Sequence, residues 1–406
     1  MARIVTVRCA HTMPTPRVDS LHHTSPPSLS RRDWLTLVAT GAAAALTGCA
    51  SRPQGLAEPS VPYLRPHSNL PFARPDITMD RIANIRVGFR PYREQGFVVR
   101  GERMGDKVVI HNYGHGGAGI TLSWGSSMLA LRELPDGVDK RAAVLGGGVM
   151  GLTTAALLIE RGWQVTLYAR ELPPHTTSDV AGGFWAPTAV FQQGQESAAF
   201  RRQLDEALRL SHDAFLARLG KGHGVSWRES YYFSSQATPS PFYLQGWPQY
   251  FPATEVLSAE RHPFASAYTL RTMSLFIEPN VMLQRLLQDL DKAGARIVRR
   301  EVRDLAELLT LPESVVFNCT GLGAAALFGD AGLQPVRGQL VLLPPDERID
   351  FVTHGGGMGL LYMFPRADAL VLGGTFERGA THVEPDEDTT RRIIEQHATL
   401  FEAMHV

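Results

Sequence analysis

The sequence has no excess charge of either sign, little cysteine and no apolar run long enough to span a membrane. Its 406 residues include 40 Lys and Arg and 40 Asp and Glu, so the formal net charge is zero. A chain of balanced charge provides no broad basic surface for nucleic acid or for an acidic membrane. The hydrophobic content of 44% is typical of a globular chain with a buried core. The length allows two domains or one large discontinuous domain.

The N-terminal region has the composition of an export signal. An arginine pair, Arg31-Arg32, precedes a weakly apolar run over 35–46 that ends at Gly48-Cys49. About 12 apolar residues are too few for a transmembrane helix, which needs ~20. The pattern resembles a twin-arginine signal ending in a lipoprotein box, with Met13 as an alternative start. We therefore expect a periplasmic lipoprotein whose membrane contact is a lipid anchor at Cys49.

Cysteine is limited to Cys9, Cys49 and Cys319. Cleavage before Cys49 would remove Cys9, and lipidation would use Cys49. Cys319 would then be the single free cysteine, so we expect no intramolecular disulfide.

The remaining chain alternates between strand-like and helical patterns. Residues 50–79 are rich in proline without apolar periodicity, which is typical of a tether or a surface wrap. A βαβ unit is predicted from a strand at 142–145, a helix at 151–161 and a strand at 164–168. Other helices are expected at 120–131, 195–219, 280–293 and 389–404, and other strands at 85–90, 96–100, 107–110, 268–277, 296–303, 315–321, 340–343, 362–364 and 370–373. The mixture predicts an α/β, Rossmann-like domain joined to a second domain with a mixed β-sheet.

A dinucleotide fingerprint lies inside the βαβ unit. Gly146, Gly148 and Gly151 have the G-x-G-x-x-G spacing, between a buried strand and a helix. The glycines permit the tight turn and close approach of a pyrophosphate to the helix N-terminus. An acid that binds ribose is expected ~20 residues later. Glu171 is slightly past that position and Arg170 lies beside it, so the fingerprint alone leaves FAD and NADP open.

Several further motifs resemble the D-amino-acid oxidase family over about residues 80–406. They are Thr176 to Pro187, Asn318-Cys319-Thr320-Gly321 with Gln334 to Gln339, Tyr362 to Pro365 with Leu372 to Phe376, Gly88-Phe89-Arg90-Pro91, and His111 to Thr121. The resemblance implies FAD as the cofactor. It also implies an enzyme that removes a hydride from the α-carbon of an amino acid and delivers it to the flavin.

The order of these motifs differs from that of the family. The Arg90 strand and the His111–Thr121 loop close the family's chain, whereas here they precede the fingerprint. This order indicates a circular permutation, with the family's ends joined through residues 133–140. It predicts that the C-terminal helix lies beside residues 80–90, because permutation requires neighbouring termini.

The resemblance implies roles for individual residues. Arg90 would bind the substrate carboxylate, since a guanidinium matches it bidentately. The Tyr362 hydroxyl would reach the same carboxylate, and the Gly117 backbone would face the flavin and the substrate amine. The implied FAD-binding residues are Gly146, Gly148, Val149, Met150, Gly151, Arg170, Glu171, Thr176, Thr177, Ser178, Gly182, Gly183, Val302, Gly116, Gly117, Ala118, Gly119, Ile120 and Thr121. His111 and His115 lack supporting acids, so we expect local hydrogen bonds there and no metal.

The resemblance also implies a domain scheme. It consists of a signal at 1–49, a tether at 50–79, substrate-domain segments at 80–103, 191–280 and 339–406, and FAD-binding segments at 104–190 and 281–338.

The substrate itself is less defined than the cofactor. Thr188 replaces a pocket tyrosine of mammalian members, and the glycine-rich stretch 354–361 is shorter than their covering loop, which predicts a more open pocket. The leading expectation is a D-amino-acid oxidase that produces a keto acid, ammonia and hydrogen peroxide. The alternatives are a glycine or secondary-amine oxidase, a dehydrogenase that passes electrons to a quinone instead of O2, and a flavin-binding lipoprotein without turnover.

Overall fold

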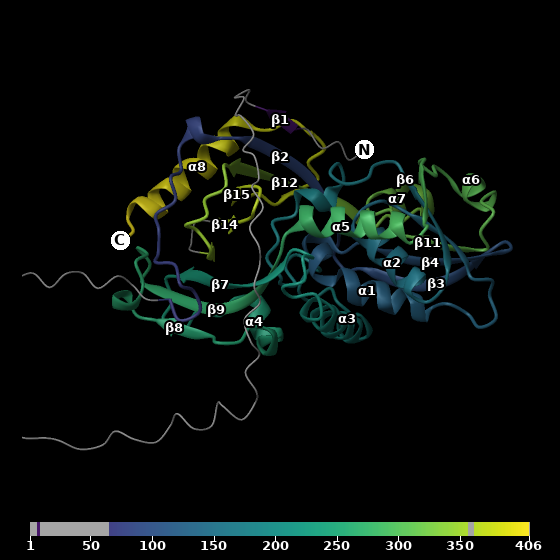
Figure 1. The fold of residues 1–406 in the computed structure, drawn as a ribbon, viewed down its shortest axis with the longest axis horizontal. Helices are drawn as coiled ribbons and strands as arrows, with labels where there is room; N and C mark the ends of the chain where they lie inside the picture. The colour runs from purple at the N-terminus through teal and green to yellow at the C-terminus, as the bar shows by residue number, and fades with distance from the viewer. Residues whose placement is uncertain (1–5, 9–64, 356–360, 406) are drawn as a thin grey trace, which may run out of the picture. The chain divides into compact units, whose positions relative to one another are not determined.

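The computed structural model describes residues 6–8, 65–355 and 361–405. Apart from Thr6–Arg8, the predicted signal with Arg31, Arg32 and Cys49 lies outside the described residues. The described residues belong to one compact unit, which contains two β-sheets and their covering helices (Figure 1).

The first sheet has six strands and includes the predicted βαβ unit. Its order is β10 (Arg296–Arg299), β6 (Gln164–Ala169), β5 (Arg141–Leu145), β11 (Val315–Asn318), β4 (Lys107–Tyr113) and β3 (Val98–Met104). The first five strands are parallel and β3 is antiparallel to β4. Such strands are buried on both faces, which explains the continuous apolar run of β5.

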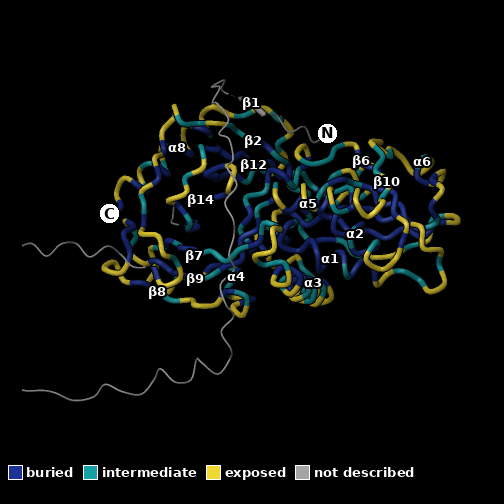
Figure 2. Tube along the Cα trace, viewed as in Figure 1, coloured by how far each residue is buried: buried dark blue, intermediate teal, exposed yellow. Residues whose placement is uncertain are grey.

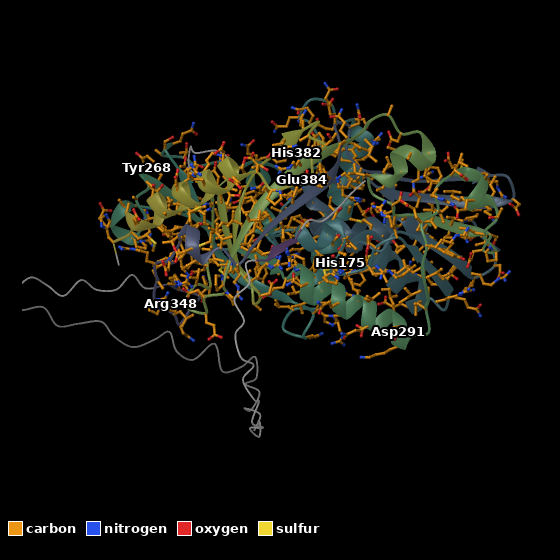
Figure 3. The ribbon with its side chains drawn as sticks, turned by 90° about the horizontal axis from the view of Figure 1, so that it is seen from above. His175, Tyr268, Asp291, Arg348, His382 and Glu384 are labelled. Atoms are coloured by element: carbon orange, nitrogen blue, oxygen red, sulfur yellow. The ribbon has the colours of Figure 1, made fainter. Side chains whose placement is uncertain are left out.

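Helices cover both faces of this sheet. Ala142 and Val144 of β5 face a core that contains α1 (Gly119–Arg132), α2 (Val149–Glu160), α3 (Ala198–Leu216) and α5 (Pro279–Lys292), while Ala143 and Leu145 face α6 (Leu305–Leu309) and α7 (Gly323–Phe328). The α3 helix is amphipathic, and its outer face is exposed in Figure 2. Charged side chains such as Asp291 and Arg348 lie on the outside of the molecule (Figure 3).

The second sheet has ten strands within the described residues. Its order is β1 (Thr6–Arg8), β2 (Asn84–Arg93), β12 (Leu333–Leu343), β15 (Leu370–Gly373), β14 (Tyr362–Pro365), β13 (Val352–Gly355), β7 (Val225–Ser234), β9 (Tyr268–Ile277) and β8 (Glu255–Leu257), with β16 (Glu377–Arg378) on β12. Most pairs are antiparallel, but β13 and β7 are parallel. Helix α8 (Glu387–Glu402) packs on β12 and β15. The short helices are α4 (Phe242–Gly246), η1 (Met79–Arg81), η2 (Gly116–Ala118), η3 (Thr177–Val180), η4 (Pro248–Tyr250) and η5 (Ala259–Arg261). The predicted Rossmann-like unit with a mixed-sheet domain is confirmed.

Several element boundaries differ from those predicted. β10 ends at Arg299, not at 303, and β12 begins at Leu333, not at 340. β12 extends because it pairs with β2 over ten positions, its polar first half included, and apolar periodicity does not reveal this tertiary contact. The strands β1, β7, β8, β13 and β16 and the helices α4, α6 and α7 were not predicted. β1 lies in the predicted signal, so cleavage before Cys49 would remove it.

The domain scheme needs three corrections. β3 pairs with β4, so residues 98–103 belong to the six-stranded sheet. β12 crosses the boundary drawn at 338 and lies entirely in the ten-stranded sheet. Residues 65–79 are not a free tether, because Phe72 and Ile77 are buried in the core under α8. Phe72 enters because the rings of Tyr231, Phe264 and Phe351 form an apolar site around it.

The two ends of the folded body are neighbours. Arg74 Nη2 donates a hydrogen bond to the Met404 carbonyl at 2.7 Å. Ile82 packs in the same apolar cluster as Ile393 and Ile394 of α8. The C-terminal helix therefore lies beside the start of β2, as predicted.

Candidate functional site

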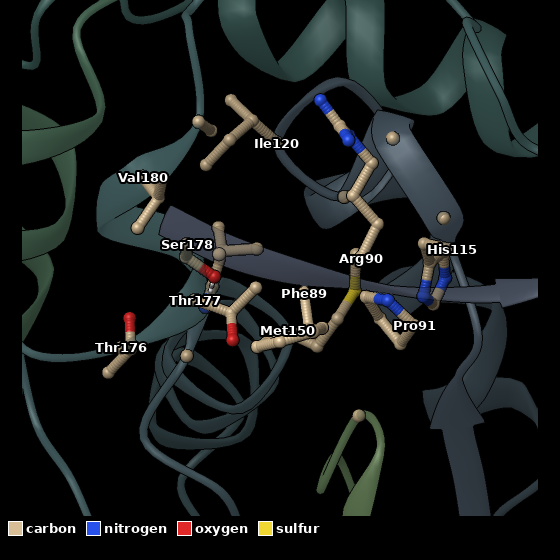
Figure 4. A pocket seen from close by; sticks show the side chains of 18 of the residues that line it. Phe89, Arg90, Pro91, His115, Ile120, Met150, Thr176, Thr177, Ser178 and Val180 are labelled. Carbon is tan, nitrogen blue, oxygen red and sulfur yellow. Dashed lines mark hydrogen bonds between the residues drawn. The ribbon is translucent and has the colours of Figure 1, made fainter. Parts of the chain in front are cut away.

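A cavity of about 900 Å³ is lined by residues from both sheets (Figure 4). It contains the end of β5, the start of α2, the η2 loop and the segment around η3. Residues of β2, β7, β13 and β14 line it from the ten-stranded sheet. The cavity therefore joins the dinucleotide fingerprint to the strands that carry Arg90 and Tyr362.

The fingerprint turn brings backbone groups close together. Gly146 has a φ of +111°, and a Cβ there would lie 2.4 Å from the Cys319 carbonyl oxygen. A Cβ on Gly151 would lie 1.9 Å from the Gly146 oxygen. Gly148 is the N-cap residue of α2 and has no side chain that could cover the helix start. Gly148, Val149 and Met150 line the cavity, so the start of α2 is a site for phosphate oxygens.

The segment around η3 is held against this helix start. The Asp179 carboxylate accepts hydrogen bonds from the Thr176 amide at 2.8 Å and hydroxyl at 2.7 Å. Ser178 Oγ accepts from the Val149 amide at 3.0 Å. The Ser178 hydroxyl proton is then available to a phosphate or ribityl oxygen of the predicted FAD. The residues fit the phosphate portion of the cofactor.

The loop before α1 is packed against residues 188–189. A Cβ on Gly116, whose φ is +56°, would lie 2.0 Å from the Ala189 oxygen, and one on Gly117 would lie 2.9 Å from the Thr188 oxygen. The Gly117 amide donates to the Ala189 carbonyl at 3.0 Å. Thr188 lines the cavity, so this contact places it beside the predicted flavin loop.

His111 and His115 make local hydrogen bonds. His115 Nε2 lies 2.6 Å from Ser126 Oγ, its ring stacks on Phe97 at 4.6 Å, and burial lowers its pKa to about 3. His111 Nδ1 accepts from the Asn318 amide at 3.0 Å, so its Nε2 donates to Glu102 at 2.8 Å. The expectation that His111 lacks a supporting acid is therefore wrong. Burial also lowers the pKa of His111. Within residues 6–8, 65–355 and 361–405, no cluster of three or more His, Cys, Asp or Glu could hold a metal ion.

The opposite end of the cavity carries alternating charges. Arg170 pairs with Glu301 at 2.6 Å and Arg299 pairs with Glu171 at 3.2 Å. Arg170, Glu171 and Glu301 line the cavity together with Val302. Val302 lies in the loop after β10, not in a strand as predicted.

Arg90 presents a charge without an acidic partner among the described residues. Its Nη1 donates to the carbonyls of Thr375 at 3.1 Å and Arg337 at 3.5 Å. Arg337 is different, because Glu377 accepts two hydrogen bonds from it at 2.9 Å. Arg93 is likewise paired with Asp330. The free charge of Arg90 in the cavity fits a bound carboxylate.

Tyr362 lies near Arg90 in the same cavity. Its ring stacks on Phe364 at 4.5 Å, and a Cβ on Gly373 would lie 2.0 Å from it. Burial raises the pKa of Tyr362, although the Arg90 charge opposes this shift. The phenol therefore remains protonated and can donate a hydrogen bond.

All the predicted site residues line the cavity except Gly151 and Ala118. Gly151 instead packs α2 on the turn, and Ala118 is buried. The sequence interpretation missed lining residues on the ten-stranded sheet and α4: Tyr232, Phe242, Tyr243 and His354. His354 begins the glycine-rich stretch that the sequence had singled out. The others lie on β7 and α4, which had no clear sequence signal.

None of the described helices is both long and apolar enough to cross a membrane.

The comparison with protein families identifies a flavoenzyme. A family model described as FAD dependent oxidoreductase matches residues 141–405. A D-amino-acid oxidase of Streptomyces coelicolor is 36% identical over 273 residues, covering 66% of this chain and 80% of that protein. A human D-aspartate oxidase is 31% identical over 279 residues, covering 65% and 77%. A solved glycine oxidase of Bacillus cereus aligns with a TM-score of 0.49 and 16% identity, covering 64% and 80%.

Proposed function

Because the chain belongs to the FAD-dependent oxidoreductases of the D-amino-acid oxidase family, we propose that it oxidises D-amino acids. The reaction consumes the amino acid, O2 and water and releases a 2-oxo acid, ammonia and hydrogen peroxide. The α-C–H bond breaks, two electrons reach O2, and water replaces the nitrogen. The relatives named D-amino-acid oxidase and D-aspartate oxidase support this substrate class.

The observation that carries the proposal is the unpaired guanidinium of Arg90 in the cavity. A half-buried cation without an acidic partner among the described residues favours an anionic ligand, and an amino acid supplies a carboxylate. Tyr362 stays protonated and adds a donor to the same ligand. These two groups would orient the α-carbon, while FAD, when bound, supplies the two-electron redox chemistry.

The test is anaerobic flavin reduction in the purified holoenzyme. We expect D-amino acids to bleach the flavin absorbance and air to restore it with release of hydrogen peroxide. Arg90→Lys should lower kcat/KM by about 30- to 1,000-fold, since the bidentate contact is lost. The bound FAD should be unaffected in this variant.

The same experiment separates the alternatives. Bleaching by glycine or sarcosine but not by larger D-amino acids would indicate a glycine or secondary-amine oxidase. Reoxidation by a quinone but not by air would indicate a dehydrogenase. A flavoprotein that none of these amines bleaches would be a binding protein without turnover.

We also propose that the chain is a circular permutation of its family. Two observations support this proposal. The family match begins at β5, and β2 and β4 precede it while pairing with β12 and β11. Arg74 and Met404 are hydrogen-bonded, so the present ends can be joined. A chain opened between Asp136 and Gly137, with residues 404 and 65 joined by a flexible linker so that Phe72 is kept in the core, should fold and bind FAD. Failure to fold would contradict the permutation.

Export is a separate proposal that rests on the N-terminal pattern. We expect a lipid-anchored protein in the periplasm, with Cys49 modified. Replacement of Arg31-Arg32 by Lys-Lys should leave the precursor in the cytoplasm, and Cys49→Ser should abolish membrane association. Unchanged fractionation of both variants would reject this localisation.

A further inference from the structure

The turn between β14 and β15 carries a buried arginine, Arg366, whose guanidinium contacts three parts of the fold. Its Nε and Nη2 atoms donate to the two carboxylate oxygens of Asp368, in the same turn, at 2.8 and 2.7 Å. Nη2 also donates to the Asn280 side chain at the start of α5. Nη1 donates to the Ala181 carbonyl at 3.1 Å. The Arg366 side chain is 1% exposed, so it ties the ten-stranded sheet to the segment after η3 from inside the protein.

The turn itself is fixed at two points. The Arg366 amide donates to the Ala369 carbonyl at 2.9 Å, which closes the turn. The Glu278 carboxylate, at the N-cap of α5, accepts from the Ala367 amide at 2.9 Å. A planar guanidinium that binds a carboxylate through two parallel hydrogen bonds has little rotational freedom. The direction of Nη1 toward the segment after η3 is therefore set by the turn.

The segment that Arg366 contacts has its carbonyls occupied and its amides without acceptors. The Ala181 carbonyl accepts from Arg366, and the Gly183 carbonyl accepts from the Ile277 amide of β9 at 2.8 Å. The amides of Gly182 and Gly183 donate to no acceptor in the part of the chain that the structure describes. Both glycines line the cavity. The carbonyls of this segment thus face the ten-stranded sheet, and the two amides are left for a ligand.

The Ala181 carbonyl and the Gly182 amide belong to one peptide group. This peptide is trans, so its C=O and N–H bonds point in opposite directions. Because Arg366 binds the carbonyl, the Gly182 N–H points away from Arg366. An amide N–H without an acceptor is unfavourable in a cavity wall from which a ligand excludes water. FAD, the cofactor of the family, carries many acceptor atoms along its length.

We propose that Arg366 is a positioning residue for FAD. It fixes the peptide between Ala181 and Gly182 so that the Gly182 amide is oriented as a donor to the cofactor. Gly182 is one of the predicted FAD-binding residues, whereas Arg366 lies outside the fingerprint and does not line the cavity. The inference concerns the cofactor and not the amine that is oxidised. A failure of the proposed D-amino-acid oxidation would leave it intact.

The first test measures ligand binding to the full chain by equilibrium dialysis. Arg366→Met is combined with Asp368→Asn, so that no buried acid is left unpaired. We expect the Kd for FAD to rise at least about 10-fold, because the Gly182 amide is no longer preorganised. AMP has no ribityl chain or flavin and probes the fingerprint end alone. Its Kd should stay within about threefold of the wild-type value.

Arg348 and Asp346 provide the matched control, in the connection between β12 and β13. They are also two residues apart, and Asp346 accepts from Arg348 Nε at 2.9 Å and from Nη2 at 2.6 Å. The Arg348 side chain is 65% exposed, unlike that of Arg366. Arg348→Met combined with Asp346→Asn should leave the Kd for FAD and for AMP within about twofold of the wild-type values.

Arg366→Lys tests the shape of the cation and not its charge. Lysine keeps a positive charge beside Asp368, but it cannot bind the carboxylate and the Ala181 carbonyl with one planar fork. We expect the Kd for FAD to rise at least about fivefold, again with little change for AMP. This variant decides the question if the double variant shows no cooperative urea transition. An unchanged Kd for FAD in the folded variant, or equal weakening of FAD and AMP, would overturn the inference.

Discussion

The guanidinium of Arg90 lies over Gly338 on the neighbouring strand, and a Cβ on Gly338 would be 2.4 Å from Arg90 Nη1. The two residues are two register positions apart on β2 and β12, since Gly338 pairs with Gly88 and Arg90 pairs with Val336. The missing side chain at Gly338 therefore creates the space in which Arg90 crosses toward the cavity. A Cβ at position 338 would clash with the flexible end of the Arg90 side chain and not with the backbone. A substitution of Gly338 should therefore move the Arg90 guanidinium and leave the strand in place.

Gly338→Ala should therefore weaken substrate binding without unfolding the protein. We expect KM for a D-amino acid to rise about 10- to 100-fold, since hydrogen bonds to charged groups contribute about 1.5–3 kcal/mol. The free energy of unfolding should change by less than about 1 kcal/mol. Steady-state kinetics and urea denaturation measure both quantities. In an Arg90→Lys background the substitution should add little, and full additivity would contradict the coupling.

Two glycines near the fingerprint should respond differently to alanine. Gly151→Ala forces a Cβ onto the Gly146 carbonyl, which is backbone, so the turn must shift. We expect apoprotein stability to fall by about 2–4 kcal/mol and FAD affinity to fall at least 100-fold. Gly119→Ala meets no protein atom closer than 3.9 Å. It should leave the apoprotein stable and weaken FAD binding by contact alone, as measured by fluorescence titration. Equal destabilisation of the two apoproteins would contradict this distinction.

Phe72 should anchor the segment before β2. It is 8% exposed and its ring lies 5.3–5.4 Å from the rings of Tyr231, Phe264 and Phe351. Phe72→Ala should lower the free energy of unfolding by about 3–5 kcal/mol, as expected for a buried aromatic ring. Leu70→Ala is the control in the same segment, since Leu70 is 41% exposed, and it should cost less than about 0.5 kcal/mol. Chemical denaturation of the two variants measures the difference, and similar values would mean that the segment is not part of the core.

His115 should make the protein less stable as the pH falls. Burial lowers its pKa from 6.5 to about 3 in the folded state, and its neighbours Phe97 and Ser126 are uncharged. The unfolded chain therefore binds one more proton than the folded one between these values. Stability is then full above pH 6.5 and is lost as the pH falls toward 3, by at most about 1.4 kcal/mol per pH unit. Denaturation at pH 7 and pH 5 should show a smaller loss in His115→Gln than in the wild-type protein. An unchanged pH slope would refute this assignment.

The fingerprint and the flavin loop could be predicted from the sequence because their chemistry is local. Gly146, Gly148 and Gly151 act through a tight turn at the start of one helix, so spacing along the chain is sufficient to recognise them. The long motif around His111 and His115 is equally contiguous. The βαβ unit could also be predicted, since β5 is buried on both faces and appears as a continuous apolar run.

The sequence by itself determined the cofactor class and predicted the residues that approach it, because both depend on short, contiguous patterns. Only the tertiary structure decided the substrate end of the cavity. Tyr232, His354 and Tyr362 come from three strands and become neighbours through sheet pairing, which no spacing along the chain reveals. The same is true of Arg90 and Gly338, whose relationship exists only because β2 and β12 pair. Pairing between distant strands depends on the packing of whole sheets, and that packing decides which charges in the cavity remain unpaired.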